Sequence, residues 1–336
     1  MNAAAAPLLE LRGISKRFEK RLDFAAKIAR KLGAKVREET VHAVDGVDLS
    51  VAEGEVVGLV GESGCGKSTL GRLVSRILEP SAGERFWKGQ PYARFDNAAA
   101  RADRLAVQMI FQDPYASLNP RLRIVDVVGE APVVHGLVAA KARDEYVADI
   151  LGRVGLDAGL MRRFPHQFSG GQRARIGIAR ALAVKPRFLV CDEAVAALDV
   201  SIQAQVLNLF IRLREEFALT YLFISHDLGV VRHVSDRVVV MYLGRIVEAA
   251  PCAEIYERPN HPYTEALIAE VPRVDARHRS YVPIKGEIAS PLDPPSGCHF
   301  HPRCPKAFER CRREAPRLRE IAPGHVSACH LNDTPS

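Results

Sequence analysis

The chain has 336 residues, a formal net charge of +7, 47% hydrophobic residues and 26% charged residues. That balance is typical of a folded globular protein, and it excludes disordered, collagen-like and coiled-coil rod chains. No apolar run reaches the roughly 18 residues of a membrane-spanning helix, and the alanine-rich start lacks the basic region of a signal peptide. Seven cysteines in a chain without an export signal are expected to be reduced thiols or metal ligands.

Hydrophobic patterning predicts alternating strands and helices in the first half of the chain. Short strands are predicted at 8–14 and 47–51, with a helix at 22–33 in the basic segment between them. A continuous apolar run at 56–60 predicts a buried parallel strand, followed by a glycine-rich turn and a helix that ends near Pro80. Further buried strands are predicted at 188–191 and 221–224. This order indicates a parallel α/β sheet, which binds ligands at the carboxyl ends of its strands.

Two other regions differ in composition. Residues 115–170 are predicted to be mostly helical, behind a proline-marked loop at 114–120. After residue 258 prolines cluster, and four cysteines with several histidines follow. We therefore divide the chain into a large first domain at 1–258 and a C-terminal domain at 259–336, which we call the tail.

Residues 61–69 read G-E-S-G-C-G-K-S-T and match the phosphate-binding pattern G-x-x-x-x-G-K-[ST]. The glycines let successive backbone N–H groups face the phosphates, and the following helix adds its positive end. Lys67 is expected to reach the β- and γ-phosphates and Ser68 to hold Mg²⁺. Cys65 is interpreted as a small loop residue without a redox role. The predicted nucleotide-binding residues of this phosphate loop are Gly61, Ser63, Gly64, Cys65, Gly66, Lys67, Ser68 and Thr69.

An acidic pair ends the second buried strand. Asp192 is expected to hold Mg²⁺ through water, and Glu193 to polarise the water that attacks the nucleotide. A solvent-facing acidic pair at a strand end is the alternative, and it is the weaker one in a chain that also has the phosphate loop.

Five motifs in order resemble those of the ATP-binding-cassette (ABC) ATPases. Besides the phosphate loop, Phe168-Ser169-Gly170-Gly171-Gln172-Arg173 resembles the signature motif. Gln112 resembles the Q-loop glutamine, Asp199 the D-loop aspartate, and His226 the switch histidine. The resemblance implies an α/β fold: a P-loop NTPase (RecA-like) core with an antiparallel β subdomain, a helical subdomain at about 115–170, and here a small Cys-containing C-terminal extension.

The same resemblance implies how the site works. Gln112 and His226 would sense the γ-phosphate and act with Glu193, and Gln112 would join Ser68 and Asp192 as an Mg²⁺ ligand. In this family the signature motif of one subunit faces the ATP bound by the other, so two half-sites make one active site. The residues implied to bind nucleotide in this way are Ser169, Gly170, Gly171, Gln172 and Asp199.

Phe18 follows the first predicted strand and is the candidate for stacking on adenine. The alternative is an ordinary core residue at a strand end. The basic segment 19–40 behind it is an insertion relative to shorter members of the family.

The tail indicates the branch of the family. His261-Pro262-Tyr263-Thr264-Glu265-Ala266-Leu267 resembles the motif of peptide/nickel-type importer ATPases, most of all the F-type ATP-binding subunit of dipeptide/oligopeptide importers. The resemblance implies ATP hydrolysis that powers uptake of di- or oligopeptides or related small solutes. It also implies a peripheral position at the cytoplasmic face of the bacterial inner membrane. The implied partners are a second ATPase subunit, two transmembrane permeases and, indirectly, a substrate-binding protein.

The alternative is a soluble ABC-type ATPase that acts on nucleic acid or ribosomes. Positive charge gathers at residues 1–45 and 272–320, and such basic ends can bind nucleic acid. However, only 56 residues separate Gln112 from Ser169, which leaves no room for coiled-coil arms or zinc modules. With the importer-type tail, this favours transport, and no nucleic-acid partner is expected.

Four cysteines of the tail form a candidate metal site: Cys298, Cys304, Cys311 and Cys329. They contain no C-x-x-C, so spacing alone leaves zinc, an iron–sulfur cluster and plain thiols as comparable readings. Four histidines lie nearby in the sequence and could ligate zinc: His299, His301, His325 and His330. Members of the resembled family carry a cysteine-bound [4Fe–4S] cluster in this tail, and the resemblance therefore implies one here, with Zn²⁺ as the alternative.

Overall fold

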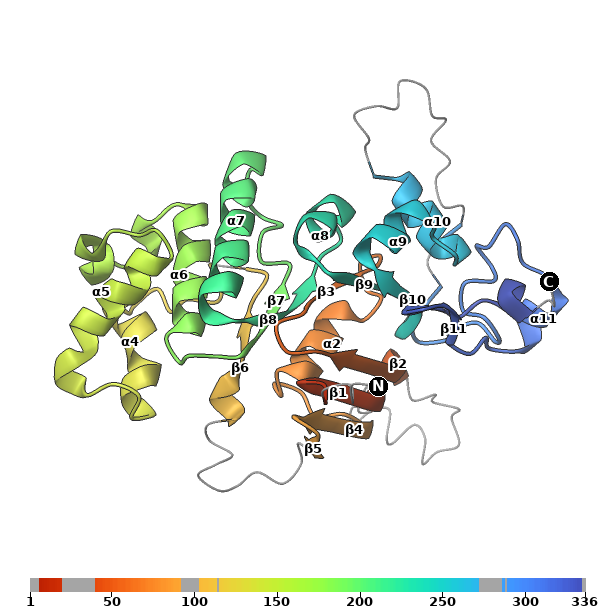
Figure 1. The fold of residues 1–336 in the computed structure, drawn as a ribbon, viewed down its shortest axis with the longest axis horizontal. Helices are drawn as coiled ribbons and strands as arrows, with labels where there is room; N and C mark the ends of the chain where they lie inside the picture. Colours follow the sequence, from red (N-terminus) through yellow and green to blue (C-terminus); the bar gives the residue numbers. More distant parts are fainter. Residues whose placement is uncertain are drawn as a thin grey trace, which may run out of the picture.

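The computed structural model describes residues 6–19, 40–91, 103–113, 115–271, 286–287 and 289–333 (Figure 1). The helix predicted at 22–33, most of the basic insertion and Pro114 of the proline-marked loop lie outside these residues. Within the described ranges, no helix is both long enough and apolar enough to cross a membrane.

The central sheet has five neighbouring parallel strands, which confirms the predicted α/β class. Both faces of these strands are covered, and the residues of β3, β7 and β8 are all buried, as their continuous apolar sequences require. In their order across the sheet, the five strands are β9 (Arg237–Tyr242), β3 (Val56–Val60), β8 (Thr220–Ile224), β7 (Phe188–Asp192) and β6 (Val107–Ile110).

Helices cover the two faces of the sheet unequally. Leu70 and Leu73 of α2 (Lys67–Val74) pack on one face, in the same core as the antiparallel sheet described next. The opposite face packs against α6 (Gly170–Leu182) and α7 (Val200–Phe217), and α8 (Leu228–Val234) lies beside β3. The prediction that the first of these helices continues to about Pro80 is wrong. Arg76 has a φ of 62°, a left-handed conformation that a helix cannot contain, and α2 ends before it.

A second sheet is antiparallel and has the order β2-β1-β4-β5. The strands predicted at 8–14 and 47–51 overlap its two longest members, which pair from Leu9 opposite Val51 to Glu19 opposite Thr40. Its four strands are β1 (Leu9–Glu19), β2 (Thr40–Val51), β4 (Ala82–Trp87) and β5 (Gln90–Pro91).

The region between the sheet and the signature motif is helical, as predicted. In Figure 1 it lies at one end of the long axis, and the tail lies at the other. Its elements are α4 (Ile124–Val134), η2 (Ala140–Ala142), α5 (Arg143–Arg153), η3 (Ala158–Arg162) and η4 (Pro165–Gln167).

The tail continues the central sheet. β10 (Arg245–Pro251) pairs antiparallel with β9, β12 (His325–Ser327) pairs with β10, and β11 (Arg319–Ala322) forms the outer edge. The division of the chain at residue 258 therefore separates two parts of one sheet, and it stays a prediction. The helical elements of this end are α9 (Cys252–Glu257), α10 (Pro262–Ala269), α11 (Glu309–Arg313) and η5 (His330–Asp333).

A buried carboxylate joins the tail to the sheet. Glu248 of β10 has no exposed surface. Its Oε1 lies 2.7 Å from the backbone nitrogen of Asn260 and 2.7 Å from Nε2 of His325, and its Oε2 accepts a hydrogen bond of 2.9 Å from the nitrogen of His261. A buried charge is tolerated only when it is bonded in this way. Glu248 thus holds the start of α10 and strand β12 at one point.

We expect Glu248→Gln to destabilise the protein by about 2–4 kcal/mol, because the amide places a donor against groups that already donate. Chemical denaturation of the full chain measures the change. Glu254→Gln is the matched control, since it removes an exposed ion pair with Arg258 and should cost less than about 1 kcal/mol. Equal destabilisation by both variants would contradict the role given to Glu248.

Candidate functional site

A cleft of about 420 Å³ opens beside the phosphate loop, at the carboxyl ends of β3 and β7. It brings together residues from the antiparallel sheet, the phosphate loop, the Q-loop and the acidic pair. We call it the nucleotide cleft. Its lining residues are Phe18, Val41, Ala43, Ser63, Gly64, Gly66, Lys67, Ser68, Thr69, Gln112, Glu193 and Pro291.

The phosphate loop has a backbone that only glycine permits at two points. Gly61 has a φ of 151°, and a Cβ there would lie 2.2 Å from the carbonyl oxygen of Met241. Gly66, which caps α2, has a φ of 107°, and a Cβ would lie 2.1 Å from the oxygen of Ala43. These close approaches fix the curl of the loop against β2 and β9.

Lys67 lies inside this curl and is 4% exposed. Its Nζ donates to the carbonyl oxygens of Gly61, at 2.8 Å, and Glu62, at 2.9 Å. Burial raises the pKa of the neighbouring Cys65 thiol, which keeps that side chain neutral and suits a small loop residue. The ammonium group is therefore placed where the loop can present it to phosphate oxygens.

Two oxygen donors meet at the end of the loop. Ser68 Oγ donates a hydrogen bond of 2.8 Å to Oδ1 of Asp192. Burial raises the pKa of Asp192, and the bond from Ser68 partly offsets that rise. A hydroxyl and a carboxylate are oxygen ligands of the kind that Mg²⁺ prefers, so these two residues fit the role predicted for them.

Glu193 lies between the other two predicted catalytic residues. Gln112 Nε2 donates a hydrogen bond of 2.7 Å to its Oε2, and His226 Nδ1 lies 3.3 Å from its Oε1. The backbone of Glu193 has a φ of 47°, an unfavourable conformation that is typical of functional sites. The arrangement holds one carboxylate in the wall of the cleft, where it can orient and deprotonate a water molecule.

The signature residues have a different position. Ser169 caps α6: its Oγ accepts from the nitrogen of Gln172 at 3.3 Å, and Gln172 Oε1 accepts from the nitrogen of Ser169 at 3.0 Å. Gly170 and Gly171 form the first turn, and Asp199 is an exposed residue that caps α7. None of these five is among the described residues that line the nucleotide cleft of their own chain.

Phe18 lies in the wall of the cleft with 40% of its surface exposed, so it is not a core residue. Its stacking role stays a prediction.

Two residues that line the cleft were not predicted. Val41 lies opposite Phe18 in the β1–β2 pair, and the strand register could have identified it. Pro291, whose oxygen accepts from the nitrogen of His42 at 3.0 Å, was not predicted either. Nothing in the sequence indicates that tail contact.

The four predicted tail cysteines all line one small enclosed cavity, the cysteine cavity. No disulfide joins them. Burial is the main cause that raises the pKa of Cys298 to about 11, and the charges of the other three cysteines contribute a smaller amount to this rise. Both ring nitrogens of the adjacent His330 are engaged, by Asp333 and by the oxygen of Glu314. No group of three or more Cys, His, Asp or Glu in the described ranges is arranged to hold a single metal ion.

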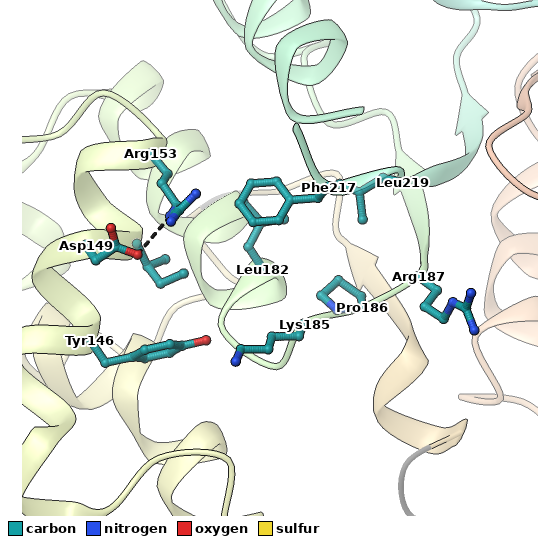
Figure 2. A pocket seen from close by; sticks show the side chains of 10 residues that line it. Tyr146, Asp149, Arg153, Leu182, Lys185, Pro186, Arg187, Phe217 and Leu219 are labelled. Carbon is teal, nitrogen blue, oxygen red and sulfur yellow. Dashed lines mark hydrogen bonds and ion pairs between the residues drawn. The ribbon is translucent and has the colours of Figure 1, made fainter. Parts of the chain in front are cut away.

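A second cleft of about 420 Å³ lies between α5 and the ends of α6 and α7 (Figure 2). Tyr146 and Arg153 of α5 lie on one wall, where Arg153 forms an ion pair of 2.8 Å with Asp149. Arg187 and Leu219 directly precede β7 and β8, so this cleft is at the amino ends of the strands, away from the phosphate loop. It contains none of the predicted site residues.

Two protein families match this chain. Residues 44–196 match the ABC transporter model, and residues 247–311 match the oligopeptide/dipeptide transporter C-terminal region. The oligopeptide transport ATP-binding protein AppF of Bacillus subtilis is 49% identical over 96% of this chain and 97% of its own length. A putative peptide import ATP-binding protein of Brucella ovis is 46% identical over 96% of this chain and 97% of its length.

Solved structures agree with the fold. An ATP-binding cassette, MJ0796, in a dimeric post-hydrolysis state bound to ADP and Pi, has a TM-score of 0.61 and 26% identity, over 73% of this chain and 98% of that chain. CbiO1 of Clostridium perfringens, part of an ABC transporter complex, has a TM-score of 0.60 and 25% identity. The match covers 76% of this chain and 92% of that chain. The likeness to both structures covers about three quarters of this chain and nearly all of theirs.

We expect Glu193→Gln to lower the rate of ATP hydrolysis at least about 100-fold, because the amide cannot accept a proton from water. ATP binding should persist, because Lys67 and the loop amides are unchanged. Phosphate release and ATP-affinity measurements test the two expectations. Glu53→Gln, a remote and exposed site, is the control. Normal turnover of the Glu193→Gln protein would contradict the catalytic assignment.

Proposed function

Since the chain belongs to the ABC transporter ATP-binding proteins with an oligopeptide/dipeptide transporter C-terminal region, we propose that it powers the uptake of di- or oligopeptides or related small solutes. It is an ATPase of a membrane ABC importer. The observation that carries the ATPase activity is the Gln112–Glu193–His226 arrangement at the phosphate loop. The names of its relatives, which are peptide transport and import proteins, support the peptide substrate.

In the proposed mechanism the phosphate loop binds ATP, with Lys67 and the start of α2 facing the phosphates. Ser68, Asp192 and Gln112 would hold Mg²⁺, which neutralises phosphate charge when bound. Glu193 takes the proton of the attacking water. Gln112 and His226 fix the direction of that carboxylate, and Phe18 stacks on the adenine.

The active site is completed by a second ATPase subunit. The signature residues and Asp199 lie outside the nucleotide cleft of their own chain, which supports a role toward a partner's ATP. The similar MJ0796 cassette is a dimer in its solved structure, which supports an assembly of two ATPase subunits. The start of α6 at Ser169 is a helix end that attracts anions, so it suits a γ-phosphate.

The remaining partners follow from the importer function. ATP binding and hydrolysis by this chain would drive transport through two transmembrane permeases. A substrate-binding protein would deliver the peptide to them. The chain would then lie peripherally at the cytoplasmic face of the bacterial inner membrane. The peptide-import names of relatives that match nearly the full length of this chain support this assembly, in which no nucleic acid takes part.

In the tail we propose a [4Fe–4S] cluster bound by Cys298, Cys304, Cys311 and Cys329, with Zn²⁺ as the alternative. Two observations support the cluster. The four thiols line one cavity, and four thiolates are the usual ligand set of such a cluster. The engaged ring nitrogens of His330 argue against this histidine as a zinc ligand.

The composite site is tested by Ser169→Arg in the assembled importer. The added side chain should block the partner's γ-phosphate and abolish ATP-dependent uptake of a labelled dipeptide, while ATP still binds at this chain's own loop. Ser169→Ala is the comparison: it removes the hydroxyl and the cap of α6, about 1 kcal/mol, but leaves room for the phosphate, so uptake should fall less than in Ser169→Arg. Full uptake by the Ser169→Arg complex would contradict the composite site.

The same uptake assay on the wild-type importer tests the substrate. Uptake of other solutes but no peptide by the wild type would contradict the peptide substrate.

The proposed cluster is tested by the metal content of the anaerobically purified protein. We expect a brown protein with about four iron and four sulfide per chain, the content of one [4Fe–4S] centre. Cys304→Ser or Cys311→Ser should bleach it and expose residues 298–329 to proteolysis, because metal binding contributes to folding there. Cys252→Ser, outside the cavity, is the control. One zinc per chain without iron would establish the alternative, and neither metal would leave plain thiols.

A further inference from the structure

A two-pronged ion pair joins the tail to the phosphate loop. Arg303 Nη1 lies 2.6 Å from Glu62 Oε2, and Arg303 Nη2 lies 2.9 Å from Glu62 Oε1. Only 5% of the Arg303 side chain and 22% of the Glu62 side chain are exposed. A bidentate pair between a guanidinium and a carboxylate is strong and directional, more so where water is largely excluded. Glu62 is the second residue of the phosphate loop, so the contact acts directly on the loop.

A second tail residue holds the backbone of Glu62. Its amide nitrogen donates a hydrogen bond of 2.8 Å to the hydroxyl oxygen of Tyr263, a fully buried residue of α10. The carbonyl oxygen of the same residue accepts from Nζ of Lys67 at 2.9 Å. Side chain, amide and carbonyl of Glu62 are thus all fixed, and two of these three contacts come from the tail.

The backbone of Arg303 is held by a well-packed aromatic cluster next to the cysteine cavity. It stands beside Cys304, and its backbone nitrogen donates to the oxygen of Phe300 at 3.0 Å. The ring of Phe300, 2% exposed, lies 5.3 Å from the rings of both Tyr242 and Tyr263. Buried aromatic contacts of this kind leave little freedom for movement. Phe300 also lines the cysteine cavity, so the same packed ring supports both Arg303 and the cavity.

We propose that Arg303 and Tyr263 are positioning residues of the phosphate loop, through which the cysteine-bearing segment of the tail sets the affinity of the loop for ATP. The physical reason is charge. The Glu62 carboxylate stands in the loop that receives the phosphates, and it repels them unless Arg303 neutralises and holds it. This inference rests on ATP binding by the phosphate loop and does not depend on which group the cysteines hold.

The test is a mutant cycle on the full-length protein, read as the Kd of MgATP. Arg303→Met leaves the carboxylate unpaired and should raise the Kd about tenfold, as expected for one charge-assisted hydrogen-bonded pair. Glu62→Gln alone should change it less than about threefold, since no unpaired charge remains. Combining the two substitutions should recover most of the affinity that Arg303→Met loses. Arg303→Lys keeps the positive charge but not the two parallel N–H donors of the guanidinium. Its Kd for MgATP should lie between those of the wild type and Arg303→Met.

Arg313→Met is the matched control. Arg313 lies ten residues further along, and its exposed ion pair with Glu309 touches neither the phosphate loop nor the cysteine cavity. The Kd of this variant for MgATP should equal that of the wild type. Wild-type affinity in Arg303→Met, or effects of the two single substitutions that simply add, would overturn the proposal. So would a loss of affinity in Arg313→Met as large as that in Arg303→Met, because it would reflect general destabilisation of the tail.

Thermodynamic linkage between ATP binding and the tail provides a second measurement, which a purely structural role of Arg303 would not change. If the tail raises ATP affinity, ATP must stabilise the tail by the same factor. Hydrogen exchange at residues 298–304 should therefore slow when MgATP binds the wild type and should not respond in Tyr263→Phe/Arg303→Met. An equal response in both proteins would overturn the proposal. Failure of the wild type to bind MgATP at all would instead contradict the proposed function.

Discussion

The register of the parallel strands is the constraint on which the site depends. Leu59 of β3 pairs with Ile224 of β8, and Ile224 pairs with Asp192 of β7, so the three strands end at one edge of the sheet. The phosphate loop, the acidic pair and the switch histidine each follow one of these ends. Because both faces of the strands are buried, a shift in register would be opposed by the whole core. Residues that lie far apart in the sequence are thereby held within hydrogen-bond distance.

Much of this fold follows from local patterns. β3, β7 and β8 are continuous apolar runs, and the glycines of the phosphate loop mark a turn that no other residue could make. Prediction was wrong where one residue departs from its usual conformation, as at Arg76, which ends α2 early. It missed β11, whose four residues are all exposed and show no alternation. That strand exists because β12 offers it a partner, and pairing of this kind leaves no trace in the local sequence.

In the candidate site too, some features could be predicted from local motifs and others could not. Lys67, Ser68 and Glu193 belong to short motifs with a clear chemical meaning, so the sequence alone is enough to predict their roles. The contacts that tie them to the rest of the molecule could not be predicted. Arg303 is 241 residues away from Glu62, and neither residue belongs to a pattern that indicates the other. The cysteines show an intermediate case: their spacing left three readings open, and only the fold shows that all four face one cavity.

The pairing of β12 with β10 has a consequence for synthesis of the chain on the ribosome. β10 ends at Pro251, whereas β12 begins only at His325. At roughly 5–20 residues per second, the hydrogen-bonding edge of β10 stays open for several seconds after β10 has been made. An unpaired edge of a largely folded sheet is a template for association with other chains. Until β12 has been made, the edge of β10 lacks the strand that covers it in the folded protein, so the nascent chain is open to aggregation during this interval.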